Sequence, residues 1–206
     1  MFHQTTEVSK EEVEWSHAAQ QGDVEAFTNL IQRYERAVYN LCYRMLGNAN
    51  DAEDAAQETF LRAYKAIGRY DPSRRFSTWV LSIGTNYCID QLRKRRLFTL
   101  SLDDMPFLDV SEDAPGPEGT MALREKQAEI NVLLAQLNGK DKAAVIMRYW
   151  YDLSYDEIAE TLSLTNSAVK SRLHRARHAL ALAMEPQGGQ PQPIKDQSMP
   201  YEAQIV

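Results

Sequence analysis

The sequence predicts an all-α protein, built as two small helical domains joined by a flexible acidic linker. Apolar residues recur at spacings of three and four along most of the 206-residue chain, and no convincing strand alternation interrupts them. Residues 99–120 carry six carboxylates and no cation, and they end in DAPGPEGT, a composition typical of a linker. Enough chain lies on each side of this linker for a small helical core.

The composition shifts divide the chain into five expected segments. The tail is rich in Gln, Pro and Gly, and such a composition cannot bury a core. We expect a disordered N-terminus at 1–12, a first domain at 13–98, the linker at 99–120, a second domain at 121–184 and a disordered tail at 185–206.

The first domain contains three predicted helices. A long amphipathic stripe predicts a helix over 23–46, and Gly47 is a typical stop signal. Asn50 and Glu53 have the spacing of a capping box, so a second helix is expected from there to residue 67. The segment GRYDPSRR predicts a loop, and Ser77 is the expected cap of the third helix.

The second domain is also helical throughout. Residues 121–137 are periodic, NGKDK predicts a turn, and a helix is expected over 143–151. Ser154 and Glu157 form a capping box that opens a short helix, which a turn at 163–166 separates from a last helix over 167–184. A short capped helix, a tight turn and a second helix make a helix-turn-helix pattern.

Positive charge is concentrated in two patches, although the net charge is −6. Residues 62–96 hold nine cations against two carboxylates and end in the run QLRKRR, while residues 165–178 hold four cations and no acid. A run of like charges repels itself unless an anion lies against it. Two separate contacts with a polyanion are therefore expected.

The last helix is a candidate for reading duplex DNA. Val169, Leu173 and Ala176 face the core in this pattern, which leaves a basic and polar face outward. Arg and Lys bind guanine edges or phosphates, and Ser and His can bond bases or backbone. The alternative is an ordinary basic surface helix. The candidate DNA contacts are Ser167, Lys170, Ser171, Arg172, His174, Arg175, Arg177 and His178.

The first domain has a different signature, in which aromatic residues are interleaved with cations. Tyr70, Phe76, Trp79 and Tyr87 lie among Arg69, Arg74, Arg75 and the QLRKRR run. Cations that follow a phosphate backbone and aromatics that hold bases are typical of single-strand binding. The alternative, that Phe76 and Trp79 are core residues, remains open.

Other function classes find no support in the sequence. It shows no Gly-rich phosphate loop, metal-ligand cluster or nucleophile–base pair, so an enzyme, a metal site or a cofactor is not expected. No apolar run is long enough to span a membrane, and the N-terminus lacks the features of a signal peptide. Cys42 and Cys88 lie in apolar helical patterns and are expected to be reduced core residues of a cytosolic protein.

Three segments together resemble the extracytoplasmic-function (group four) sigma factors of bacterial RNA polymerase. They are DAEDAAQETFLRAYKAI, FSTWVLSIGTNYCIDQLRKRR and LSYDEIAETLSLTNSAVKSRLHRARHAL, in the family's order and with a linker between the domains. The resemblance covers about residues 13–184. It implies that the first domain binds core polymerase and recognises and melts the −10 element, and that the second reads the −35 duplex.

The resemblance also implies roles for particular residues. Asp51, Asp54, Gln57, Glu58 and Leu61 match the surface that docks on a coiled coil of the polymerase β′ subunit. Asn86 and Asp90 stand at positions that contact unpaired bases, although Asp90 departs from the asparagine common in the family. His174 stands where some relatives carry an aromatic. The implied −10 contacts are Arg69, Arg74, Arg75, Phe76, Trp79, Asn86, Asp90, Arg93, Lys94, Arg95 and Arg96.

The implied partners are core RNA polymerase, through its β′ and β subunits, promoter DNA and an anti-sigma factor, with no small-molecule substrate. In the family the linker threads through the nucleic-acid channel of the polymerase, and a simple tether is the alternative. The main rival function is a stand-alone helix-turn-helix regulator that binds duplex DNA without polymerase.

Overall fold

The computed structural model of the chain describes residues 9–101 and 121–184, and within these ranges every regular element is a helix. The all-α prediction is confirmed. The expected linker, apart from its first residues, and the expected tail lie outside the described residues. The helices are α1 (Lys10–Gln20), α2 (Val24–Leu46), α3 (Ala49–Ala66), the short 3₁₀ turn η1 (Ile67–Arg69), α4 (Phe76–Ser101), α5 (Met121–Ala135), α6 (Gly139–Trp150), α7 (Tyr155–Leu162) and α8 (Asn166–Met184).

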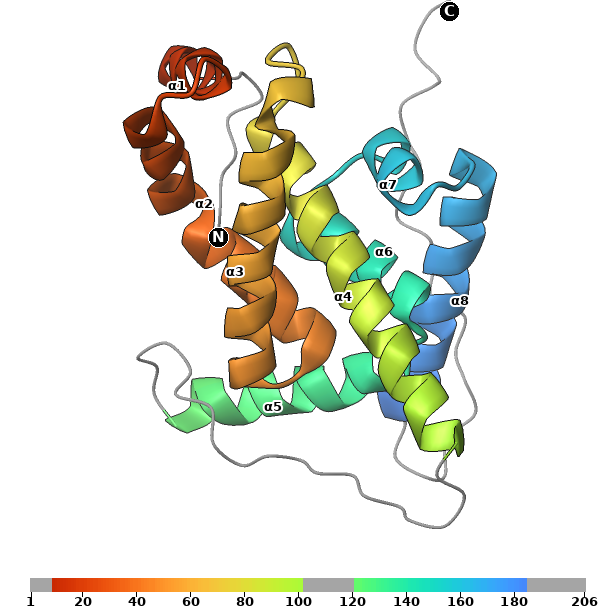
Figure 1. Ribbon diagram of the computed structural model, residues 1–206. Coiled ribbons are helices and arrows are strands. Elements are labelled where there is room, and N and C mark those ends of the chain that lie inside the picture. The colour runs from red at the N-terminus through yellow and green to blue at the C-terminus, as the bar shows by residue number, and fades with distance from the viewer. Residues whose placement is uncertain (1–8, 102–120, 185–206) are drawn as a thin grey trace, which may run out of the picture.

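Helix α4 runs through the middle of the molecule, with α1–α3 on one side and α6–α8 on the other, while α5 crosses one end (Figure 1). The two halves are not separate in space, because α2 and α4 both contact α6, and α4 also contacts α7. Within the described residues, none of the helices combines the length and apolarity that a membrane crossing needs.

Several helix ends match the sequence prediction. Asp23 accepts hydrogen bonds from the backbone N–H groups of Glu25 (2.9 Å) and Ala26 (3.1 Å), so it caps α2. Gly47 ends the helix with φ of 78°, a left-handed conformation that glycine adopts without strain. The Ser154–Glu157 capping box at the start of α7 is confirmed in both directions.

Other ends were predicted wrongly. Asn48, not Asn50, caps α3 by accepting from the Asp51 N–H at 3.1 Å. The NGKDK segment is not a turn as a whole, because Asn138 caps α6 and the helix begins at the next residue. The first error arises because two polar residues near a helix start have the right chemistry, and tertiary packing selects between them.

Helix α1 begins inside the segment that was expected to be disordered. Glu12 and Ser16 are 5% and 0% exposed, and the Ser16 hydroxyl donates to the Glu12 carbonyl at 2.6 Å. The sequence KEEVEWSHAAQ carries only a weak apolar stripe, so its periodicity did not indicate a buried helix. Its burial depends on contacts with distant residues, which are described below.

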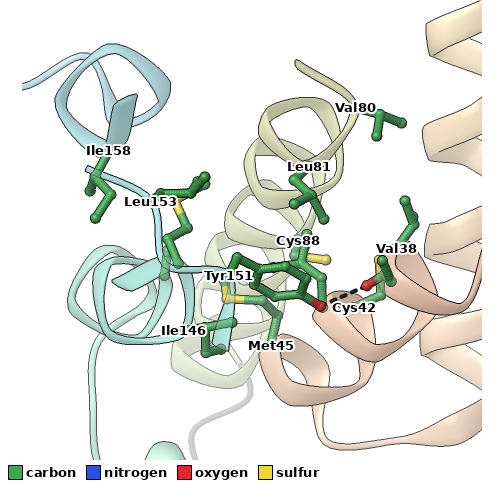
Figure 2. Close-up of a cluster of buried hydrophobic side chains, with 14 of the residues drawn as sticks. Val38, Cys42, Met45, Val80, Leu81, Cys88, Ile146, Tyr151, Leu153 and Ile158 are labelled. Carbon is green, nitrogen blue, oxygen red and sulfur yellow. Dashed lines mark hydrogen bonds between the residues drawn. The ribbon is translucent and has the colours of Figure 1, made fainter. Parts of the chain in front are cut away.

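One hydrophobic core extends through both halves of the molecule. Val38, Cys42 and Met45 of α2 lie beside Leu81 and Cys88 of α4, and side chains from α6 and the segment after it complete the cluster (Figure 2). Both cysteines are free and fully buried, as the sequence predicted.

Close approach of α4 to α2 and α3 requires glycine at position 84. A Cβ there would lie 3.2 Å from the Thr59 hydroxyl and 3.3 Å from the Leu41 Cδ2. Both neighbours are fully buried, so neither side chain has space into which to move. Gly84 therefore sets how closely α4, which carries the candidate −10 contacts, packs on the domain.

Candidate nucleic-acid interface

The loop at residues 70–75 is held in one shape by its own hydrogen bonds. The buried Tyr70 donates from its hydroxyl to the Arg74 carbonyl, and Asp71 Oδ1 accepts from the Ser73 N–H at 3.0 Å. Hydrogen bonds from the backbone and the side chain of Ser73 lower the pKa of the Asp71 carboxyl. From α1, Gln20 donates to the Tyr70 carbonyl at 2.6 Å. The loop thus presents its arginines from an ordered backbone.

Helix α1 also caps the start of α4. The Glu12 carboxylate accepts a hydrogen bond from the Phe76 N–H at 3.0 Å and another from the Tyr34 hydroxyl. Burial and this bond to Glu12 raise the pKa of Tyr34. Ser77, the expected cap, lies inside the helix and is buried. Sequence reasoning missed Glu12, because a cap supplied from a remote helix leaves no local signal.

The aromatic residues of this region form a packed cluster rather than a row of open platforms. Ring centroids are 4.8 Å apart for Tyr70 and Trp79, 5.4 Å for Phe76 and Trp79, and 5.5 Å for Tyr34 and Phe76. Phe76 is 0% exposed, so the core interpretation holds for it and a direct DNA contact is not available in this structure. Trp79 is only half-buried.

Trp79 borders a cavity of about 460 Å³ that joins the two halves of the chain. Arg69, Arg74, Arg75, Trp79 and Asn86 line one side. The opposite side comes from α7 and the turn that follows it. The structure therefore brings these five candidate −10 contacts together around one space.

The remaining −10 candidates lie farther along α4. Asp90 is exposed and pairs with Arg93 at 3.2 Å. Arg93, Lys94 and Arg96 are exposed, which leaves their charges accessible to solvent. Arg95 instead pairs with Asp51 of α3 at 2.7 Å. This ion pair connects the basic run to the candidate polymerase-binding helix.

The candidate polymerase-binding face lies on α3. Asp54 and Gln57 are exposed, and Glu58 is bonded to Arg62 at 2.7 Å. Leu61 is 47% exposed in the middle of this polar face. Tyr64 is 41% exposed and packs edge-on against Phe27. Exposed apolar side chains surrounded by carboxylates are typical of a protein-docking surface.

Helix α8 presents the predicted outward face. Val169, Leu173 and Ala176 are buried, as the sequence predicted. Arg172 does not point outward freely, because it bonds the buried Asp141 carboxylate at 2.7 Å. Arg177 is half-buried. The exposed members of the candidate set are Ser167, Lys170, Ser171, His174, Arg175 and His178.

Helix α7 braces α8 in the manner of a helix-turn-helix unit. Asp156 accepts a hydrogen bond from the Asn166 side chain at the start of α8. Two cations lie near the Tyr155 ring, the Lys170 ammonium 5.7 Å and the Arg148 guanidinium 5.6 Å from its centroid. Such cation–π contacts restrict where Lys170 points.

Comparison with known proteins identifies both halves of the chain. Residues 30–98 match the family described as Sigma-70 region 2, and residues 127–180 match Sigma-70 region 4. The ECF RNA polymerase sigma factor SigW of Bacillus subtilis is 37% identical over 166 residues, which cover 77% of this chain and 89% of SigW. The RNA polymerase sigma-H factor of Pseudomonas aeruginosa is 32% identical over 81% of this chain and 90% of its own length.

A solved structure agrees with these sequence matches. The structure of CnrH in complex with the cytosolic domain of CnrY superimposes with a TM-score of 0.64 at 25% identity, covering 84% of this chain and 97% of CnrH. Region 2 corresponds to most of the half that contains α2–α4, and region 4 to most of the half that contains α5–α8. The chain belongs to the ECF group of sigma-70 family RNA polymerase sigma factors.

Proposed function

We propose that this chain is an alternative sigma factor that docks on core RNA polymerase through α3 and reads a promoter with two separate surfaces. The observation that supports it most strongly is the distribution of three unlike surfaces over one chain. An acidic face with exposed apolar residues, an ordered arginine loop beside Trp79, and an exposed basic recognition helix follow one another in the order of regions 2 and 4.

The α3 face supplies the polymerase contact. Leu61 and Tyr64 are the apolar anchors, and Asp54, Gln57 and Glu58 form their polar surround. Buried apolar anchors commonly provide most of the binding energy of an interface, while the surrounding groups exclude water. We assign this face to the β′ subunit, and the second domain supplies the contact with β.

The cavity beside Trp79 captures one unpaired base of the −10 strand. Unstacking a base costs a few kcal/mol. The Asn86 amide can donate to and accept from a base edge, and the half-buried Trp79 offers an aromatic surface. Arg69, Arg74 and Arg75 would hold the phosphates on either side. Binding of the extruded base offsets the cost of melting, so the strand stays open.

The exposed face of α8 reads the −35 duplex. Lys170, His174 and Arg175 project from one side of the helix and can meet base edges in a major groove. The exposed hydroxyls of Ser167 and Ser171 position the helix on the backbone. No chemical step is assigned to this chain, and its contribution to initiation is recognition and strand capture alone.

The cellular context follows from the family. Bacterial RNA polymerase acts in the cytoplasm, so we place the chain there. The similar CnrH structure contains the cytosolic domain of CnrY. We propose that this chain has a protein partner of its own, an anti-sigma factor that holds it inactive.

Gel filtration with purified core polymerase tests the polymerase assignment. Leu61→Asp places a charge at the centre of the α3 face and should weaken the complex about tenfold or more. Arg175→Ala is the matched control in the other half, and should bind core polymerase as the wild type does but lose selective promoter binding. If Leu61→Asp binds core polymerase normally, or Arg175→Ala loses it, the division of roles is wrong.

A further inference from the structure

The loop that carries the −10 arginines is tied at its start to α1 by one side chain. The Gln20 amide nitrogen Nε2 donates to the Ile67 carbonyl at 3.1 Å and to the Tyr70 carbonyl at 2.6 Å. Both acceptors are carbonyl oxygens, so only the nitrogen of the Gln20 amide can make these bonds, which fixes the orientation of the amide. Gln20 therefore holds the backbone where the 3₁₀ turn η1 passes into the loop.

The end of the loop is tied to the same helix. The Glu12 carboxylate accepts from the Phe76 N–H, where α4 begins, and from the Tyr34 hydroxyl of α2. Glu12 is 5% exposed, and a carboxylate is stable at such a buried position only while its oxygens are hydrogen-bonded. Glu12 and Gln20 lie about two turns apart on α1, which contacts η1 and lies beside the loop between η1 and α4 (Figure 1).

The two anchored residues of the loop, Tyr70 and Phe76, both contact Trp79. Ring centroids are 4.8 Å apart for Tyr70 and Trp79, and 5.4 Å apart for Phe76 and Trp79. The Tyr70 hydroxyl also donates to the Arg74 carbonyl. The position of the Trp79 ring at the cavity and the path of the backbone at Arg74 thus depend on where α1 holds Tyr70 and Phe76.

Helix α1 lies outside the segment that identifies the family, because the match to region 2 begins at residue 30. It carries only a weak apolar stripe, and yet it buries Glu12 and Ser16. Burial of polar groups costs free energy unless they are hydrogen-bonded. The long-range bonds of Glu12 and Gln20 lead to the two ends of the loop, which gives this polar helix a specific place of attachment.

We propose that α1 is a clamp that sets the base selectivity of the −10 reading surface, with Gln20 and Glu12 as positioning residues. This inference rests on the proposed function, because it assigns the loop and Trp79 to an unpaired base. Recognition groups must stay within about 0.5 Å of their productive positions. A loop released from α1 would sample other positions, so the preferred base would lose more affinity than the other bases, while the sequence-blind phosphate contacts would persist.

Equilibrium binding of the reconstituted polymerase complex to promoter DNA tests the clamp. The promoter is one whose start site is mapped with the wild-type chain, and a non-complementary template strand keeps its −10 segment unpaired. Each −10 base and each −35 base pair is replaced in turn, and the ratio of dissociation constants for the replaced and the original sequence is measured. A general loss of stability lowers the active fraction for every template alike, so it leaves these ratios unchanged.

Gln20→Met is the principal variant, because methionine is similar in length, suits a half-buried position and cannot donate a hydrogen bond. The largest −10 ratio should fall about three- to tenfold, and the −35 ratios should change less than about twofold. Asp23→Ala is the matched control. The Asp23 carboxylate follows α1 directly but caps α2, so its removal destabilises the fold and should change neither set of ratios by more than about twofold.

Glu12→Asp tests the other end of the loop. It keeps the charge but shortens the side chain, which draws the acceptor away from the Phe76 N–H. It should lower selectivity at the same −10 position as Gln20→Met, because both residues act on Trp79. Circular dichroism and gel filtration with core polymerase establish that each variant is folded and bound, and Gln20→Met alone decides the matter if Glu12→Asp does not fold.

The pattern of the ratios separates failure of the clamp from failure of the proposed function. A fall in the −10 ratios alone, absent in Asp23→Ala, supports the clamp. Unchanged −10 ratios in Gln20→Met, or −10 and −35 ratios that fall together, would overturn it. A wild-type complex that binds core polymerase but distinguishes none of the −10 bases contradicts the proposed function instead.

Discussion

Arg172 and Arg175 lie three positions apart on α8, and the structure predicts opposite consequences for their removal. Arg172 bonds the Asp141 carboxylate at 2.7 Å, and the side chains are 24% and 9% exposed. Arg175 is exposed and belongs to the proposed DNA-reading face. Arg172→Ala should therefore destabilise the fold, and Arg175→Ala should impair only DNA recognition.

The loss of stability expected for Arg172→Ala depends on the hydrogen bonds that the Asp141 carboxylate keeps. Breaking a buried ion pair by removal of one partner costs about 3–5 kcal/mol, because a buried charge loses its compensation. The Asn138 amide still donates to Asp141 at 2.6 Å, so we expect about 3 kcal/mol, near the lower limit. Removal of Arg175 should change the free energy of unfolding by less than about 0.5 kcal/mol but cost about 1–3 kcal/mol of promoter discrimination.

Urea unfolding and promoter binding by the reconstituted polymerase measure the two quantities separately. Arg172→Ala/Asp141→Asn completes a double-mutant cycle, and it should be more stable than Arg172→Ala alone because no uncompensated charge remains. Equal stability of Arg172→Ala and Arg175→Ala would refute the reasoning. Full retention of promoter selectivity by Arg175→Ala would remove the −35 role of that residue.

Three further predictions follow from buried or hydrogen-bonded groups. Glu12→Gln weakens the cap on the Phe76 N–H and should lower the free energy of unfolding by about 1–3 kcal/mol in urea titrations; an unchanged midpoint would contradict that role. Burial alone would raise the pKa of Glu157, but hydrogen bonds to its carboxylate outweigh burial and hold the pKa below its ordinary 4.5. The contribution of the Glu157 carboxylate to stability is therefore complete above pH 4.5 and is lost as the pH falls through the lowered pKa. Thermal unfolding of the wild type and of Glu157→Gln should show a difference in stability that disappears as the pH falls through this range. A difference that stays constant with pH would refute this role of Glu157. Bonding to Cys42 and burial raise the pKa of Cys88, so alkylation at neutral pH should modify neither thiol until urea unfolds the chain, whereas labelling of the native protein would contradict their burial.

Local chemistry made much of the helical framework predictable. The Ser154 capping box, the Gly47 stop and the inward face of α8 depend on residues within a few positions of one another, so their signals survive in sequence alone. The acid-free face of α8 could be assigned for the same reason. Local rules failed where two neighbouring residues could both cap a helix, as at Asn48 and Asn50.

Features that depend on distant partners could not be predicted. Glu12 becomes the cap of α4 only when α1 folds against a helix far along the chain. Arg172 was assigned to DNA because its charge suits a phosphate, and only packing revealed Asp141 beside it. The packing of α7 on α4 is also tertiary. The sequence predicted two small helical domains joined by a linker, and the structure adds that the two domains share one core.

Transcription by reconstituted polymerase tests the central claim most directly, namely that this chain gives core polymerase a promoter specificity. Core enzyme from the source bacterium would be incubated with genomic DNA with and without the purified chain, and transcript 5′ ends would be mapped. The account predicts a new, limited set of start sites that share upstream sequences. This set should appear only when the chain is present, and it should be lost with Leu61→Asp. A folded chain that binds the core enzyme and changes no start site would contradict it.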